Sequence, residues 1–184
     1  AKLRLEMRSE IRRLQSETGI TAILVTHDQI EAMSMCDRIA LMKDGRIEQI
    51  STPTEMYEHP ASRYVASFLS NPPISFLQAE ANGALTFGDG NKLPLPQGIT
   101  AHGPITLGIR PEHFGPHHDG PLISGRVSFI EPQGREDLMD VTLSDNQRLR
   151  AIVPAGHSYK LGQDVRWPVD LERTHLFDVE GTRL

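Results

Sequence analysis

Residues 24–33 read LVTHDQIEAM, and this stretch decides how the first part of the chain folds. Residues 20–25 (ITAILV), which lead into it, form a short apolar run with several β-branched side chains. Such a run predicts a strand that is covered on both faces, as in a parallel sheet. Because ligands of open α/β sheets bind at the carboxyl ends of such strands, His27 lies where a ligand is expected.

A short helix is expected directly after this strand. Asp28 and Glu31 have the spacing of a capping box, and Thr26 with Gln29 offers a second such pair. We therefore expect a helix from Gln29 to Met35. A histidine just before such a helix can donate one N–H to a phosphate oxygen while a neighbour fixes its other nitrogen.

The segment before the apolar run predicts an amphipathic helix over residues 2–18. Four apolar side chains recur at three- and four-residue spacing, so they share one helix face: Leu3, Met7, Ile11 and Leu14. Charged side chains line the other sides: Arg4, Glu6, Arg8, Glu10 and Arg12. Gly19 follows where a left-handed C-terminal cap is expected.

The segment after the loop predicts a hairpin and two helices. Asp44-Gly45 is a strong two-residue hairpin signal. Thr52-Pro53 reads as an N-cap followed by proline at the first helical position. The expected elements are strands at residues 38–43 and 46–50, a helix from Thr52 through about Tyr57, and a helix over residues 61–69.

The composition changes near residue 70, at Ser70-Asn71-Pro72-Pro73. Residues 71–184 contain 11 of the 13 prolines and 13 of the 15 glycines, which predicts many short strands in a small barrel or sandwich. The expected strands are residues 76–81, 84–87, 105–110, 122–130, 138–143, 148–153, 165–170 and 175–177. The expected turns include Asn82-Gly83, Asp89-Gly90 and Ser144-Asp145-Asn146.

The composition also excludes several classes of protein. The net charge is −5, from 19 basic and 24 acidic residues that are mixed along the chain, which argues against nucleic-acid binding through a broad basic face. No apolar run approaches the roughly 18 residues that a membrane-spanning helix needs. The single cysteine, Cys36, cannot form an internal disulfide, so we expect a cytoplasmic protein.

Val25-Thr26-His27-Asp28 with Glu31-Ala32 resembles the switch-histidine loop of ABC-transporter ATPases. Five further segments agree in order. Residues 1–4 resemble the residues just after the loop that ends in Leu-Asp in the importer subfamily, and residues 42–47 resemble the β-hairpin after the switch loop. Residues 52–57 and 60–68 resemble the closing helices, and residues 107–112 the signature of the importer regulatory domain. The C-terminal residues 176–184 also fit. The resemblance therefore covers nearly the whole chain.

The resemblance implies two domains. Residues 1–70 would be the C-terminal part of an α/β ABC ATPase (nucleotide-binding) domain, and residues 74–184 an all-β, OB-fold-like barrel of the TOBE type with a regulatory role. The implied function is to energise the import of a small polar solute, of the sugar or glycerol-3-phosphate class, as in the ATPase of the maltose importer. His27 would be catalytic: it would contact the ATP γ-phosphate and help to position the attacking water.

The other parts of an ATPase site are not in this sequence. It has no G-x-x-x-x-G-K-[ST] loop, no apolar strand ending in Asp-Glu and no Ser-Gly-Gly-Gln signature. We therefore expect ATP and Mg²⁺ to bind to the intact subunit, no metal ligands in this chain, and no ATPase activity of this chain alone. The alternatives are a non-catalytic regulatory or interaction fragment, or an unrelated β-domain protein with a chance switch-like loop.

The resemblance also implies partners and a location. The intact subunit would form a homodimer with a second copy of itself, beneath two membrane-spanning permease subunits. A solute-binding protein would act on it indirectly, and nucleic acid would not be a partner. It would lie peripherally at the cytoplasmic face of the inner membrane.

Other residues carry weaker signals. His117-His118 is either a metal pair or a solvated turn, and a Gly/Pro-rich loop without further ligands favours the turn. Cys36 reads as a small packed residue rather than a nucleophile. Arg110-Pro111-Glu112 is either an ion pair that fixes a strand end or an effector contact. Three methionines read as core residues: Met33, Met35 and Met42.

Overall fold

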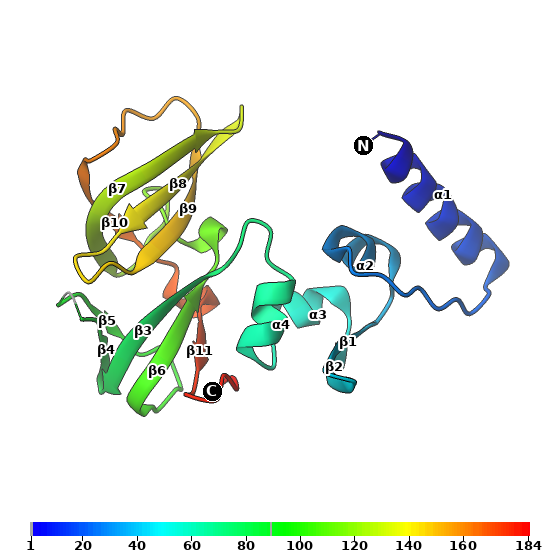
Figure 1. Cartoon of the computed structure of the whole chain (residues 1–184), viewed down its shortest axis with the longest axis horizontal. Helices are drawn as coiled ribbons and strands as arrows, with labels where there is room; N and C mark the ends of the chain where they lie inside the picture. Colours follow the sequence, from blue (N-terminus) through cyan, green and yellow to red (C-terminus); the bar gives the residue numbers. More distant parts are fainter. Residues whose placement is uncertain (1, 89) are drawn as a thin grey trace. The chain divides into compact units, whose positions relative to one another are not determined.

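The computed structural model describes residues 2–88 and 90–184, without the side chains of Lys2 and Arg4. The chain divides into two compact units, one up to Ala61 and the other from Ser62 to Leu184 (Figure 1). We call them the N-terminal unit and the β unit and describe each by itself. Among the described helices, none is long and apolar enough to cross a membrane.

The N-terminal unit contains three helices and one hairpin. Its elements are α1 (Lys2–Thr18), α2 (Gln29–Met35), β1 (Ile39–Lys43), β2 (Arg46–Ser51) and α3 (Pro53–Glu58). Gly19 ends α1 with a φ of 64°, as its position predicted. Thr52 caps α3 by accepting a hydrogen bond from the Glu55 N–H at 3.3 Å. These helices and the hairpin confirm the local sequence signals.

The β1–β2 hairpin has the expected tight turn. Asp44 and Gly45 both have positive φ, 48° and 76°, as a type I′ turn requires. Ile39 and Leu41 alternate with exposed residues along β1 and are buried. Met42 is exposed, so the prediction that it is a core residue is wrong, because it lies on the outward face of that alternation.

The predicted strand at residues 20–25 is not formed, which corrects the sequence analysis. The segment is non-helical and unpaired, and the side chains of Ile23 and Val25 are 91% and 92% exposed. A strand exists only through hydrogen bonds to a neighbour. In the described part of the N-terminal unit, the only sheet is the β1–β2 hairpin, and this segment does not join it.

The helix α1 forms as predicted, but its apolar face is open. Leu3, Met7, Ile11 and Leu14 are all exposed. The contacts with α2 come from a different side of the helix, through Arg8 and a hydrogen bond from Arg12 to the carbonyl oxygen of Met35 at 3.3 Å. The charged side of α1 therefore makes the contacts within this unit.

The β unit opens with α4 (Arg63–Phe68) and continues as two antiparallel sheets (Figure 1). One has the order β10-β7-β8-β9 and the other β11-β6-β3-β4-β5. The strands are β3 (Ser75–Asn82), β4 (Ala84–Thr86), β5 (Lys92–Pro94), β6 (His102–Ile109), β7 (Leu122–Pro132), β8 (Glu136–Thr142), β9 (Arg148–Pro154), β10 (Asp164–Pro168) and β11 (His175–Phe177), with 3₁₀ turns η1 (Pro111–His113) and η2 (Leu171–Arg173).

All eight strands expected in this region are present. β5 was not expected, because it has only three residues and ends in a proline. Of the predicted Asp89-Gly90 turn, Asp89 lies outside the described residues. The two sheets enclose one apolar core, and Trp167 packs there against Phe114 and Tyr159, with ring centroids 5.7 and 4.9 Å apart.

The two sheets also meet through a pair of side-chain amides. Asn91, just before β5, accepts a hydrogen bond from the Ser124 N–H and donates one to the Ser124 carbonyl oxygen, both at 3.0 Å. Gln147, just before β9, makes the same pair of bonds with the backbone of Gln78 in β3. Each amide replaces a strand's backbone at a point where β7 or β3 extends beyond its shorter neighbour.

The helix α4 groups with the β unit. The Arg63 N–H donates to the carbonyl oxygen of Gly181 at 2.8 Å, and Ala66 packs with Ile74 and Phe177. The compact units thus divide at Ser62, whereas composition predicts a domain boundary at residues 70–74. The division into residues 1–70 and 74–184 stays a prediction about the intact protein.

Candidate functional site

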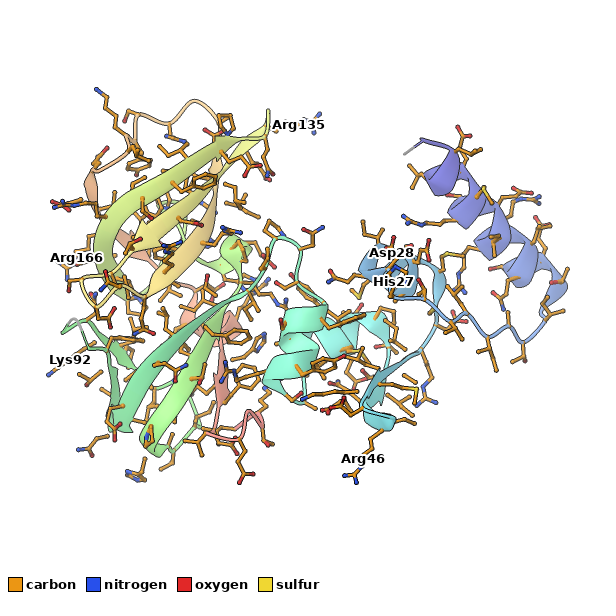
Figure 2. The ribbon with its side chains drawn as sticks, viewed as in Figure 1. His27, Asp28, Arg46, Lys92, Arg135 and Arg166 are labelled. Atoms are coloured by element: carbon orange, nitrogen blue, oxygen red, sulfur yellow. The ribbon has the colours of Figure 1, made fainter. Side chains whose placement is uncertain are left out.

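His27 lies in the loop between the extended segment and α2, and its side chain is exposed. Figure 2 shows it beside Asp28 at the start of α2. Among the described residues, none is recorded in a hydrogen bond or ion pair with the imidazole. The predicted site residue is therefore open to a ligand, and its neighbours decide how firmly it is held.

Thr26, the residue before His27, holds the loop through its hydroxyl group. Its hydroxyl accepts a hydrogen bond from the Asp28 N–H at 3.0 Å and donates one to Glu31 Oε2 at 2.7 Å. A hydroxyl bonded to the backbone two residues ahead fixes a local turn. The bend at His27 is set by this turn, and the bond to Glu31 ties the turn to α2.

Asp28 is the N-cap of α2, as the capping pattern predicted. Its Oδ1 atom accepts hydrogen bonds from the N–H groups of Ile30 and Glu31, at 2.9 and 3.1 Å. These bonds satisfy two donors that the first helical turn leaves without partners. The residue after His27 is thus fixed to the helix by its own side chain.

Arg8 joins this loop from α1, which the sequence did not reveal. Its Nη2 atom lies 3.1 Å from Asp28 Oδ2 and 3.4 Å from Glu31 Oε1, and its side chain is only 15% exposed. In the sequence Arg8 is one of several charged residues on α1. Only the docking of α1 on α2 distinguishes it, although the two carboxylates three residues apart were a sign that a cation was needed.

Arg12, one turn further along α1, contacts the other end of α2. It donates to the carbonyl oxygen of Met35 at 3.3 Å and forms an ion pair with Asp37. The hydrogen bond from Arg12 lowers the pKa of Asp37. Cations are favoured at a helix C-terminus, where carbonyl groups lack partners. Two arginines thus hold α1 to both ends of α2.

The remaining predicted candidates show no assembled site. The rings of His117 and His118 lie 4.2 Å apart, and burial lowers the pKa of His117. Within residues 2–88 and 90–184, no group of three or more His, Cys, Asp or Glu could hold a metal. Burial raises the pKa of Cys36, which disfavours the reactive thiolate. Arg110 is 1% exposed, which favours a structural role over effector contact.

The β unit carries a shallow, open groove along β7 and β10. Ser124, Arg126 and Thr142 line it from β7 and β8, and Asp164 and Arg166 line it from β10. Arg126 and Asp164 form an ion pair with an N–O distance of 2.8 Å. The groove is open to solvent, and its charges are partly neutralised within it.

The β unit matches a known domain family in sequence. Residues 107–177 match the family model described as the TOBE domain. The β unit is therefore a TOBE-domain module, as residues 107–112 had suggested. The cytoplasmic molybdate-binding protein ModG is a more distant likeness, with a TM-score of 0.44 and 13% identity over 56% of this chain and 93% of that chain.

Several known proteins are similar to this chain over its whole length. The chain is 45% identical over 186 residues to the sn-glycerol-3-phosphate import ATP-binding protein UgpC of Jannaschia sp., and 40% identical over 187 residues to UgpC of Ruegeria pomeroyi. It is 40% identical over 192 residues to the sulfoquinovosyl glycerol transport ATP-binding protein SmoE of Agrobacterium fabrum. These matches cover 100% of this chain and 52%, 52% and 53% of the relatives.

The chain is thus a homologue of the C-terminal half of these ATP-binding proteins of sugar and glycerol-3-phosphate importers, which confirms the resemblance stated above. It spans about half the length of the curated relatives that it matches.

Proposed function

We propose that this chain is the C-terminal half of an ATP-binding subunit that energises the import of a small polar solute of the sugar or glycerol-3-phosphate class. The observation that carries the proposal is similarity over the entire chain to import ATP-binding proteins, at 45% identity in one case. The ordered loop that presents an exposed His27 supports it.

In this proposal His27 is the catalytic residue of the chain. Its imidazole donates an N–H to an oxygen of the ATP γ-phosphate and helps to position the attacking water. Phosphoryl transfer depends mainly on positioning and on stabilising developing charge. A histidine on a loop fixed by Thr26 and Asp28 suits that task, because its backbone is held while its side chain is open.

The intact subunit would bind ATP with Mg²⁺ through segments outside this sequence. The described side chains offer no cluster for a metal, so we assign no step to Mg²⁺ here. The working assembly would be a homodimer with two membrane-spanning permease subunits at the cytoplasmic face of the inner membrane, with a solute-binding protein acting indirectly.

A regulatory or interaction role for the chain is the second candidate. The observation that favours it is the β unit, which has its own enclosed core and an open groove. The two functions are compatible in one intact subunit. They differ in whether the N-terminal unit takes part in hydrolysis.

The test is the substitution His27→Ala in the intact subunit. Phosphate release is expected to fall by about 100-fold or more, because a group that acts mainly in the transition state is lost. The dissociation constant for ATP is expected to change by less than about threefold. The G-x-x-x-x-G-K-[ST] phosphate loop that we expect in the intact subunit would supply most of the binding. The measurements are steady-state phosphate release and equilibrium nucleotide binding.

His59→Ala is the matched control, because His59 is also an exposed histidine of the N-terminal unit and lies outside the loop that carries His27. It should leave both quantities unchanged. The 184-residue chain alone is expected to release no phosphate above the His27→Ala background. Equal losses of binding and hydrolysis in His27→Ala would contradict the catalytic role.

A further inference from the structure

We infer that Arg8 is a positioning residue for His27: from α1 it holds the loop that carries the histidine and so sets where the imidazole meets the phosphate. The inference rests on the proposed function for its chemical meaning. Its geometric content, that Arg8 orders the backbone at His27, can be tested separately.

Arg8 is connected to the residues on both sides of His27. Arg8 reaches Asp28, the residue after His27, with an N–O distance of 3.1 Å. It also reaches Glu31, whose second oxygen accepts the hydroxyl of Thr26, the residue before His27, at 2.7 Å. The Asp28 N–H donates to that same hydroxyl. A closed ring of polar contacts thus surrounds the backbone of His27, and Arg8 is its only cation.

Arg8 also neutralises two neighbouring carboxylates. Asp28 and Glu31 both lie within 3.4 Å of one nitrogen of Arg8, so their carboxylates are close together, and their side chains are only 30% and 29% exposed. Two carboxylates in such a place repel each other unless a cation lies between them. Without Arg8 they would separate, and Thr26 would lose its fixed acceptor. They would also present two negative charges beside a histidine that meets a phosphate.

The helix α1 is a fixed support for Arg8. Arg12 ties the same helix to the Met35 carbonyl and to Asp37 at the other end of α2. Two attachments one turn apart keep α1 from rotating against α2. The backbone of Arg8 is therefore held in place by α1, and this positions the guanidinium at the loop.

The bonding pattern predicts which substitution should rescue the role. Both carboxylates are reached by Nη2, and Nε has no hydrogen-bond partner among the described residues. A lysine ammonium also offers several donors from one nitrogen. We therefore expect Arg8→Lys to keep most of the ordering, and Arg8→Met, which keeps an apolar stem without the charge, to lose it.

Arg13→Met is the matched control. Arg13 lies on the same helix and, among the residues that the structure describes, forms ion pairs only with Glu10 and Glu17 of that helix. Its loss weakens α1 without touching the loop. An effect shared by Arg8→Met and Arg13→Met would arise from the helix in general rather than from positioning.

The first experiment measures order at His27 without requiring activity. The intact subunit is labelled with ¹⁵N-histidine, and the backbone amide of His27 is assigned by its loss in His27→Ala. The heteronuclear NOE of that amide is expected to fall in Arg8→Met and to stay at the wild-type value in Arg8→Lys and Arg13→Met. An unchanged NOE in Arg8→Met would overturn the inference.

The second experiment measures the consequence for hydrolysis. Misplacing a reacting group by about 1 Å can cost up to about 100-fold in rate, so phosphate release by Arg8→Met should fall by about 10- to 100-fold. The dissociation constant for ATP should change by less than about threefold, because the lesion affects positioning rather than binding. Arg8→Lys should stay within about threefold of the wild-type rate, and Arg13→Met should match wild type. A parallel loss of binding and rate in Arg8→Met would overturn the positioning role.

If Arg8→Met does not fold, Thr26→Val takes its place, because it removes the hydroxyl of the same ring at nearly constant volume and should give the same two losses. If the wild-type intact subunit hydrolyses no ATP, the proposed function is wrong, whereas the NOE comparison still decides whether Arg8 orders the loop.

Discussion

Asn91 and Gln147 show how single side chains can complete a sheet. In each case a side-chain amide pairs with both the N–H and the carbonyl of one residue, Ser124 or Gln78. A carboxamide is the side chain that reproduces a peptide group, with one donor end and one acceptor end. Both residues directly precede an edge strand, so each joins its own sheet to the opposite one where no strand pairing is available.

We predict that Asn91→Asp and Gln147→Glu each lower the free energy of unfolding of the β unit by about 1 kcal/mol at neutral pH. Each change keeps the shape but removes the donor and sets a carboxylate oxygen against a carbonyl oxygen. The measurement is urea unfolding followed by the fluorescence of Trp167, the only tryptophan, which is buried in this unit.

Gln97→Glu is the control for the added charge, since Gln97 is exposed and its side chain makes no hydrogen bond to another residue that the structure describes. It is expected to leave the urea midpoint unchanged. If Asn91→Asp and Gln147→Glu behave like this control, the two amides do not stabilise the joint between the sheets.

At the scale of elements, the N-terminal unit has apolar surfaces that its own elements do not cover. Residues 20–25 are extended but unpaired, and the apolar face of α1 is exposed. Contiguous exposed apolar surface in a soluble fold marks a place where another segment packs. The relatives are about twice as long as this chain, so they contain further segments that could supply the cover.

We predict that the backbone amides of residues 21–25 exchange with deuterium almost unprotected in this chain and become protected by about 100-fold or more in the intact subunit. Pairing with a neighbouring strand would supply the missing hydrogen bonds and bury Ile23 and Val25. Peptide-level hydrogen exchange with mass spectrometry measures this directly.

A peptide from β8, a central strand of the β unit, is the internal reference and should be equally protected in both proteins. Equal, low protection of residues 21–25 in both proteins would mean that the apolar run is not a strand in the intact subunit either, and the α/β prediction for residues 1–70 would fail.

In the whole molecule, composition and packing place the start of the β unit at different residues. Composition places the change near residue 70, whereas packing places it at Ser62. Val65, Ala66 and Leu69 of the α4 region are buried. Removing them would expose Phe177 and Ile74, which pack with Ala66.

We predict that limited proteolysis of the 184-residue chain leaves a stable core that begins between His59 and Ser62. The exposed extended segment before α2 should be cut early, because proteases act on unpaired backbone. Intact-mass measurement of the core identifies its first residue. Ala66→Asp places a charge in the packed contact and should move the start to about Asn71, since the helix would no longer be held.

A wild-type core that begins at Asn71 would instead support the boundary that composition indicated. A core made of residues before Ser62, with the β unit degraded, would contradict both the packing boundary and the independence of the β unit.

The sequence by itself determined the features that depend on short-range interactions. Asp28 caps α2, the Asp44-Gly45 turn closes the hairpin, and the eight expected strands of the β unit formed, because caps, turns and alternation act between neighbours in the chain. The position of His27 at the start of a helix was also foreseen, and so was the TOBE domain, through the resemblance of residues 107–112.

Only the tertiary structure decided the contacts that join distant segments. Arg8 lies 20 residues from Asp28 in the chain, and Gln147 lies 69 residues from Gln78, so no local pattern distinguishes them from other polar residues. The run at residues 20–25 shows the converse: its apolar, β-branched character indicates a strand, but a strand needs a hydrogen-bonding neighbour. Pairing is a property of the partner as well as of the segment, and that is why periodicity alone could not supply it.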